Sequence, residues 1–171
     1  MVTIKQKEIA IVIPSYDEVK NVSILIKKIT SELDFGKLIV VDDSKKSENK
    51  KLKHVIKNYK NVILISRLKK DGRGSAVVEG FREALKYKIS YIFEMDSDLA
   101  HDPKEFKRFI KKANSGNFDL IIGSRYLPGG KIINITADRT IMSRVINHFL
   151  YIWLGIHLTD HTSGFKLYNR R

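Results

Sequence analysis

The sequence contains no cysteine, only three prolines, and no uninterrupted apolar run of the ~18 residues that a membrane-spanning helix needs. Without cysteine there is no disulfide framework, and the redox compartment is left open. The N-terminal residues lack the apolar run of a signal peptide, so we expect a cytoplasmic chain. No internal repeat, low-complexity tract or linker interrupts the 171 residues, which predicts a single domain over residues 1–171.

Acidic residues are scarce relative to basic ones. The chain has 19 Asp and Glu against 32 Lys and Arg, for a formal net charge of +13. Such a charge indicates anionic partners, which include nucleic acid, a membrane surface and phosphorylated substrates. The sequence has no basic stripe interleaved with aromatic residues and no nucleic-acid recognition motif, so no nucleic-acid partner is expected.

Short apolar, β-branched segments alternate with segments whose apolar residues recur at helical spacing. The expected strands cover residues 8–13, 37–41, 61–65, 89–93 and 118–123. Helical spacing between them is typified by Val22, Leu25, Ile26 and Ile29. The alternation predicts an α/β fold with a Rossmann-like, mostly parallel sheet and helices on both faces. A further apolar helix is expected over residues 139–154.

Polar clusters follow the first, second and fourth expected strands, at residues 15–18, 42–43 and 96–98. The carboxyl ends of parallel strands meet at one edge of a sheet, where open α/β folds bind ligands. Asp96 and Asp98 can hold a divalent cation there, and the cation can hold a diphosphate. The alternative is that they only cap the next helix. It is disfavoured because Asp102 and Pro103 already form a helix start.

The other polar residues at this edge each have two interpretations. Ser15 and Glu18 match a capping box, and we expect them to cap the first helix. Tyr16 is either a solvated loop aromatic or a stacking surface for a nucleobase. Asp42 and Asp43 are either turn residues, or one of them accepts a hydrogen bond from a base or ribose.

Two arginines, Arg125 and Arg139, flank the glycine pair at residues 129–130. They are either solvated or bind the phosphate oxygens of an anionic donor, which a guanidinium suits well. The histidines show no metal-ligand spacing. Only His101 neighbours the acidic pair, and we expect it to support the pair or face solvent rather than bind a metal.

The segment Gly72-Arg73-Gly74 matches half of a dinucleotide-binding fingerprint. It lacks the third glycine and follows the third expected strand rather than the first, which argues against a nicotinamide enzyme. No Gly-x-x-x-x-Gly-Lys-Ser/Thr sequence is present, which argues against a P-loop enzyme. We expect Gly72 and Gly74 to permit a tight turn near the ligand.

Taken together, these motifs resemble one family. They occur in order at residues 11–18, 40–44, 72–76, 95–103, 123–126 and 160–166, with Arg139, Ser143 and Asn147 between the last two. In this joint pattern the chain resembles the family 2 glycosyltransferases, and within them the members that make dolichyl- or polyprenyl-phosphate mannose. The resemblance covers nearly the whole chain and implies the nucleotide-diphosphosugar transferase (GT-A) fold.

The resemblance also implies roles for individual positions. Contacts to the nucleotide sugar are implied for Pro14, Tyr16, Glu18, Val41, Asp43, Asp96 and Arg125. Catalytic roles are implied for Asp96, Asp98, Arg125 and Arg139, with Mg²⁺ or Mn²⁺ bound by Asp96 and Asp98. Some relatives place a glutamine as a third metal ligand two residues after the second aspartate, where this chain has Ala100.

The implied reaction is the metal-dependent transfer of mannose from GDP-mannose to dolichyl or polyprenyl phosphate, with inversion at the anomeric carbon. It implies a peripheral location at the cytoplasmic face of a membrane and is compatible with a membrane-anchoring partner. The helix expected over residues 139–154 either guides the lipid or is a plain core helix.

Two alternatives stay open at this point. The same fold can use UDP-glucose or another nucleotide sugar, with a lipid phosphate or a saccharide as acceptor. The chain can also be a noncatalytic nucleotide-sugar-binding module, because it stops soon after Lys166 whereas relatives usually continue with elements that shape the acceptor site.

Overall fold

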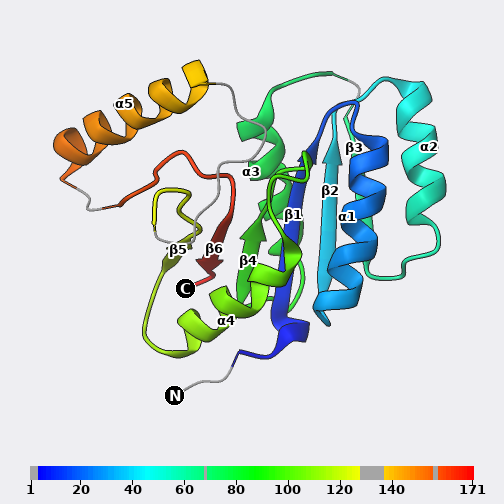
Figure 1. Cartoon of the computed structure of the whole chain (residues 1–171). Helices are drawn as coiled ribbons and strands as arrows, with labels where there is room; N and C mark the ends of the chain where they lie inside the picture. The colour runs from blue at the N-terminus through cyan, green and yellow to red at the C-terminus, as the bar shows by residue number, and fades with distance from the viewer. Residues whose placement is uncertain (1–3, 68, 128–136, 156–157) are drawn as a thin grey trace.

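The computed structural model describes residues 4–67, 69–127, 137–155 and 158–171 (Figure 1). One six-stranded sheet runs through it in the order β3-β2-β1-β4-β6-β5. The strands are β1 (Ile9–Ser15), β2 (Lys37–Asp42), β3 (Val62–Ser66), β4 (Tyr91–Glu94), β5 (Leu120–Ile122) and β6 (Lys166–Asn169).

The sheet is mostly parallel, as predicted. β1 pairs in parallel with β2 and β4, and β2 pairs in parallel with β3. β6 was not foreseen and lies antiparallel between β4 and β5. β5 is shorter than the predicted strand over residues 118–123, because it pairs with β6 along three residues only.

Helices cover both faces of the sheet, which confirms the predicted layering (Figure 1). α1 (Val19–Glu32), α2 (Lys46–Ile56) and α4 (Phe106–Asn114) lie on one face, and α3 (Arg73–Ala84) lies on the other. A 3₁₀ turn, η2 (Pro103–Glu105), leads into α4, and another, η1 (Gln6–Glu8), precedes β1.

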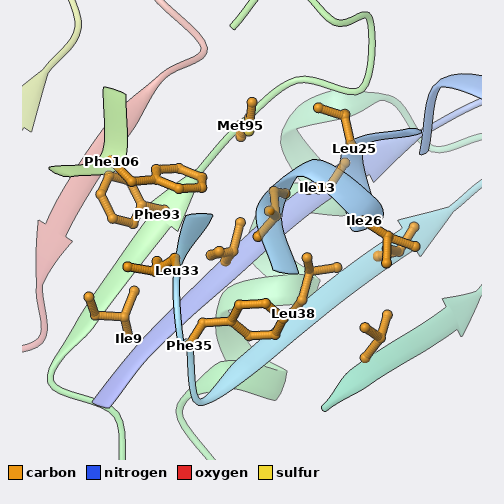
Figure 2. Close-up of a cluster of buried hydrophobic side chains, with 14 of the residues drawn as sticks. Ile9, Ile13, Leu25, Ile26, Leu33, Phe35, Leu38, Phe93, Met95 and Phe106 are labelled. Carbon is orange, nitrogen blue, oxygen red and sulfur yellow. The ribbon is translucent and has the colours of Figure 1, made fainter. Parts of the chain in front are cut away.

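Alternate residues of β1 explain why that strand contains no polar residue before its end. Ile9, Ile11 and Ile13 belong to the larger apolar cluster beneath α1, α2 and α4, part of which Figure 2 shows. Ala10 and Val12 belong to the cluster beneath α3. Side chains along a strand alternate between its faces, so a strand covered on both sides must be apolar throughout.

Aromatic packing fills the larger cluster next to β4. The fully buried Phe93 ring lies 4.5 Å from Phe106, 5.4 Å from Phe109 and 6.0 Å from Phe165, measured between ring centroids. Burying one such side chain contributes about 1.5–3 kcal/mol relative to leaving it exposed. Since Phe165 immediately precedes β6, this cluster helps to hold the last strand beside β4.

α5 (Ala137–Leu154) stands at one end of the molecule, away from the sheet (Figure 1). Large apolar side chains project from it into solvent: Met142, Val145, Ile146, Phe149, Tyr151, Ile152 and Trp153, the last 71% exposed. This exposure is not that of a core helix. Within the described ranges, no helix combines the length and the hydropathy that crossing a membrane requires.

Candidate active site

The loops after β1 and β2 are joined at the carboxyl edge of the sheet. The parallel register places Pro14 beside Val41. The backbone N–H of Asp43 donates to the carbonyl of Ser15 at 3.0 Å, and the N–H of Asp17 donates to Ser44 Oγ at 2.7 Å. The segments implied to contact a nucleotide are therefore adjacent.

The capping prediction for the first helix was wrong. β1 continues through Ser15, and α1 begins at Val19 with Glu18 as its N-cap, without a capping hydrogen bond from the side chain. Asp17, between the end of β1 and this N-cap, adopts the left-handed region with φ 57°. The Glu18 carboxylate instead accepts a hydrogen bond from Asn21, three residues later in the chain.

Tyr16 is exposed at 40%, and the ammonium of Lys70 lies 3.8 Å from the centroid of its ring. A cation over an aromatic face is attracted by the ring quadrupole. The contact links the loop after β1 to the loop before α3. Because the ring is exposed, a solvated aromatic and a stacking surface for a nucleobase both stay predictions for Tyr16.

The two aspartates at the end of β2, Asp42 within the strand and Asp43 just after it, differ in their surroundings. Asp42 is fully buried and accepts hydrogen bonds from Ser44 Oγ at 2.6 Å and from Asn49 Nδ2 at 2.9 Å, so it fixes the start of α2. Asp43 is paired with Arg67, whose Nη2 lies 2.6 Å from Asp43 Oδ2. Hydrogen bonding to Asp43 raises the pKa of Arg67 above its usual value, despite partial burial.

Arg67 was missed by sequence reasoning. It directly follows β3 and also donates to Ser75 Oγ at 2.8 Å, so it connects Asp43 to the first turn of α3. The available signal was its position, because a basic residue at the end of a parallel strand lies at the same edge as the other polar clusters.

Asp96 lies just beyond β4 in an ion pair with Arg73. Its Oδ1 accepts from Arg73 Nε at 2.6 Å, and its Oδ2 lies 3.6 Å from His101 Nε2. Burial alone would raise the pKa of the Asp96 carboxyl, but His101 and Arg73 outweigh burial and hold that pKa below its ordinary value. Asp96 is therefore an anion. The predicted supporting role of His101 is compatible with this contact.

Asp98 lies in a turn. It is exposed, and its Oδ1 accepts a hydrogen bond from the backbone N–H of Ala100 at 2.9 Å. Leu99 between them has φ 65°, an unusual conformation for a bulky residue that this turn enforces. The expected helix start is confirmed, since Asp102 accepts from the N–H of Lys104 at 3.1 Å.

The acidic pair fits a hard divalent cation by its donor chemistry. Across the described residues, no group of three or more His, Cys, Asp or Glu side chains is arranged to hold a metal ion. Mg²⁺ is commonly bound by one or two carboxylates together with substrate phosphates and water, which is what Asp96 and Asp98 can offer. Ala100 adds no side-chain donor.

Arg125 is held by the fully buried Asp160. Its Nε lies 2.8 Å from Asp160 Oδ2 and its Nη2 lies 2.9 Å from Oδ1, with further hydrogen bonds to Thr162 at 2.7 Å and Ser143 at 3.3 Å. The pairing raises the pKa of Arg125 above its usual value. Arg139 lies in α5, and its side chain is outside the described residues.

Gly164 brings the segment before β6 against Asp96. A Cβ at this position would overlap Asp96 Oδ2 and lie 2.9 Å from Arg73 Nη2. The next residue, Phe165, stacks on the His101 ring with centroids 5.0 Å apart. Segments far apart in the sequence therefore enclose Asp96 together.

Solved glycosyltransferases share this architecture. A glucosyl-3-phosphoglycerate synthase from Mycobacterium tuberculosis, in complex with Mn²⁺, UDP-glucose and phosphoglyceric acid, matches with a TM-score of 0.67 at 19% identity, over 95% of this chain and 56% of that chain. A mannosyltransferase from Pyrobaculum calidifontis, in complex with GDP-mannose and Mn²⁺, matches with a TM-score of 0.62 at 11% identity, over 95% and 44%. The fold is the GT-A glycosyltransferase fold.

Residues 10–171 match the family described as glycosyl transferase family 2, and the chain belongs to that family. It is 30% identical over 158 residues to an undecaprenyl-phosphate mannosyltransferase of Micrococcus luteus, covering 92% of this chain and 64% of that protein. It is 31% identical over 162 residues to a polyprenol monophosphomannose synthase of Mycolicibacterium smegmatis, covering 94% and 61%. The chain thus spans less than two thirds of the length of these relatives.

Proposed function

We propose that this protein is a metal-dependent inverting glycosyltransferase that moves mannose from GDP-mannose to a polyprenyl phosphate, such as a dolichyl phosphate. The observation that carries the proposal is the acidic pair, Asp96 and Asp98, after β4, which pairs in parallel with β1 and so ends at the same edge of the sheet as the joined loops after β1 and β2. The names of the two mannosyl-transferring relatives support the sugar and the lipid class.

In this proposal the donor lies across the carboxyl edge of the sheet. The loops that carry Tyr16 and Asp43 hold the nucleotide, and Arg67 fixes the orientation of the Asp43 carboxylate. Asp96 and Asp98 hold Mg²⁺ or Mn²⁺, which when bound neutralises the charge of the leaving diphosphate. The remaining contributions come from side chains that orient the reactants.

The acceptor in this proposal is a phosphate and already an anion, so no side chain has to remove a proton from it. The chemical difficulty is to hold two anionic reactants together, and preorganised cations serve that purpose. Arg125 and Arg139 are assigned to the phosphates of the donor or acceptor. The bidentate pair with Asp160 keeps the Arg125 guanidinium in one orientation.

A lipid acceptor requires contact with a membrane surface. We assign that contact to the exposed apolar side chains of α5, aided by the net charge of +13. Apolar helices that lie in the interface and basic surfaces that face anionic lipids commonly act together. The resulting association is peripheral, at the cytoplasmic face of the membrane.

The test begins with calorimetric binding of GDP-mannose and UDP-glucose, each with Mn²⁺ and then with chelator. Metal-dependent binding of GDP-mannose, followed by release of GDP when polyprenyl phosphate is added, is the expected result. Tighter binding of UDP-glucose than of GDP-mannose would mean that UDP-glucose, and not GDP-mannose, is the donor. Binding without any release of nucleotide would favour a noncatalytic nucleotide-sugar-binding module, and failure to bind either donor would reject the proposal.

A further inference from the structure

Arg73, the first residue of α3, bridges two carboxylates on and just after β4. Its Nη2 lies 2.7 Å from Glu94 Oε1, and its Nε lies 2.6 Å from Asp96 Oδ1. The guanidinium therefore engages the same Asp96 carboxylate that the proposed function assigns to a divalent cation. Asp96 has an internal cation as a partner.

Glu94 anchors the guanidinium at this place. Its side chain is 4% exposed, and its second oxygen accepts a 2.8 Å hydrogen bond from the Tyr168 hydroxyl. Within the described part of the chain, Arg73 is the only cationic side chain in an ion pair with Glu94. A buried carboxylate needs such a counter-charge, so the contact with Glu94 is the permanent one.

The contact with Asp96 is the exchangeable one. The Asp96 side chain is 29% exposed, and its other oxygen faces His101 and the backbone at Gly164. With those two groups closing one side, a cation that binds Oδ1 competes with the Nε–H of Arg73 for that oxygen. Because separate nitrogens of Arg73 contact the two carboxylates, the loss of the contact with Asp96 need not break the contact with Glu94.

We propose that Arg73 is a positioning residue that competes with the divalent cation for Asp96 and so makes metal binding depend on the nucleotide. This inference rests on the proposed metal site at Asp96 and Asp98. Metal alone binds weakly because it must displace a charged hydrogen bond. When a nucleoside diphosphate enters with the metal, the guanidinium exchanges Asp96 for a phosphate oxygen, and both ligands bind more tightly together than singly.

Calorimetry of the whole chain with Mn²⁺ alone, GDP alone and Mn²⁺ with GDP tests the inference. Arg73→Met should bind Mn²⁺ alone roughly tenfold more tightly than the wild type, because a competing positive charge is gone. GDP should then strengthen Mn²⁺ binding by a smaller factor than in the wild type. A purely structural role for Arg73 would weaken Mn²⁺ binding instead.

Arg108→Met is the matched control. It removes the same charge from an exposed ion pair between Arg108 of α4 and Glu105 of η2, and it should leave Mn²⁺ affinity unchanged. Circular dichroism checks folding. If Arg73→Met does not fold, the double variant Arg73→Met with Glu94→Gln removes the buried charge and makes the same prediction. Mn²⁺ affinity that is unchanged or reduced in a folded variant overturns the inference.

A variant of the proposed metal site separates the two proposals. If the wild type binds Mn²⁺ and Asp98→Asn does not, the proposed metal site is supported. If, in addition, Arg73→Met does not bind Mn²⁺ more tightly than the wild type, only the role of Arg73 is rejected. If neither the wild type nor Arg73→Met binds Mn²⁺, the metal site and the inference fail together.

Discussion

At the scale of single residues, Asp98 and Asp102 are a natural comparison. Both are exposed aspartates after β4, but Asp98 belongs to the proposed metal pair whereas Asp102 caps the turn before α4. Under the proposed function, Asp98→Ala should lower mannosyl transfer roughly a hundredfold or more, because one of the two proposed metal ligands is lost. Asp102→Asn should leave transfer nearly unchanged, since asparagine is an equally good N-cap. A radiolabelled mannose assay measures both, and full activity in Asp98→Ala would reject the metal role.

Asp160 should govern part of the acid stability. Burial alone would raise the pKa of its carboxyl, but hydrogen bonds from Arg125 hold it below the ordinary value. The pair therefore stabilises the fold above the unfolded pKa of about 3.9, and this stabilisation is lost as the pH falls through the lower, folded pKa. Asp160→Asn should lower the free energy of unfolding at pH 7 by about 3 kcal/mol and remove this part of the loss in acid.

Urea unfolding between pH 7 and pH 3 measures this effect. Asp34→Asn is the control, because Asp34 pairs with Lys7 on the surface, where both side chains are well exposed. Such pairs contribute between zero and about 1 kcal/mol. Equal losses of stability in the two variants would contradict the importance assigned to the buried pair.

The residues that sequence reasoning found and missed differ in a physical way. Asp96 and Asp98 could be predicted as candidates, and Asp102 as a helix cap, because their setting between a strand and a helix start is local in the sequence. Arg67 and Arg73 were missed as partners of the acidic residues, since Arg67 meets Asp43 and Arg73 meets Asp96 only through the packing of α3 and the sheet. The position of Arg67 after a strand indicates the edge of the sheet at which it lies, but no local pattern indicates which carboxylate either arginine contacts.

At the scale of elements, α3 approaches the sheet closely at Gly80. A Cβ there would overlap Val12 Cγ1 and lie 3.2 Å from Val41 Cγ2, whereas a Cβ at Gly74 of the same helix would meet nothing within 4 Å. Gly80→Ala should therefore destabilise the protein by about 1–3 kcal/mol, and Gly74→Ala should stabilise it by up to about 1 kcal/mol. Urea unfolding of the two variants tests the difference, and equal effects would contradict the close contact of α3 with β1.

Elements were predicted where burial imposes a clear pattern. β1 to β4 read as short apolar runs because helices cover both faces of the sheet. β6 was missed because its sequence, Lys166-Leu167-Tyr168-Asn169, has no apolar pattern. Only Leu167 in this strand is buried. Its place between β4 and β5 is decided by contacts across the molecule and not by its own composition.

At the scale of the whole molecule, the exposed apolar face of α5 should carry membrane association. Trp153 is the only tryptophan of the sequence and is 71% exposed, so its fluorescence reports on that face. Vesicles that contain anionic lipid should shift its emission to shorter wavelength, and added salt should weaken the binding.

Ile152→Asp should reduce the vesicle affinity by roughly tenfold, since it places a charge in the apolar interface. Val78→Asp introduces the same charge on the exposed surface of α3 and should have a much smaller effect. Equal losses in both variants would indicate that net charge, and not α5, determines the association.

The position of β6 has a consequence for how the protein folds. β6 comes last among the described strands but lies inside the sheet, so β5 has no neighbour until residues 166–169 have paired with β4. The parallel strands β1 to β4 can associate earlier, which leaves the row of backbone groups on β4 unpaired in the meantime. Such an unpaired strand edge can form hydrogen bonds with strands of other chains. We therefore expect β5, with the Arg125–Asp160 pair beyond it, to be the last part of the sheet region to become native, and nascent chains to be most prone to aggregate just before that step.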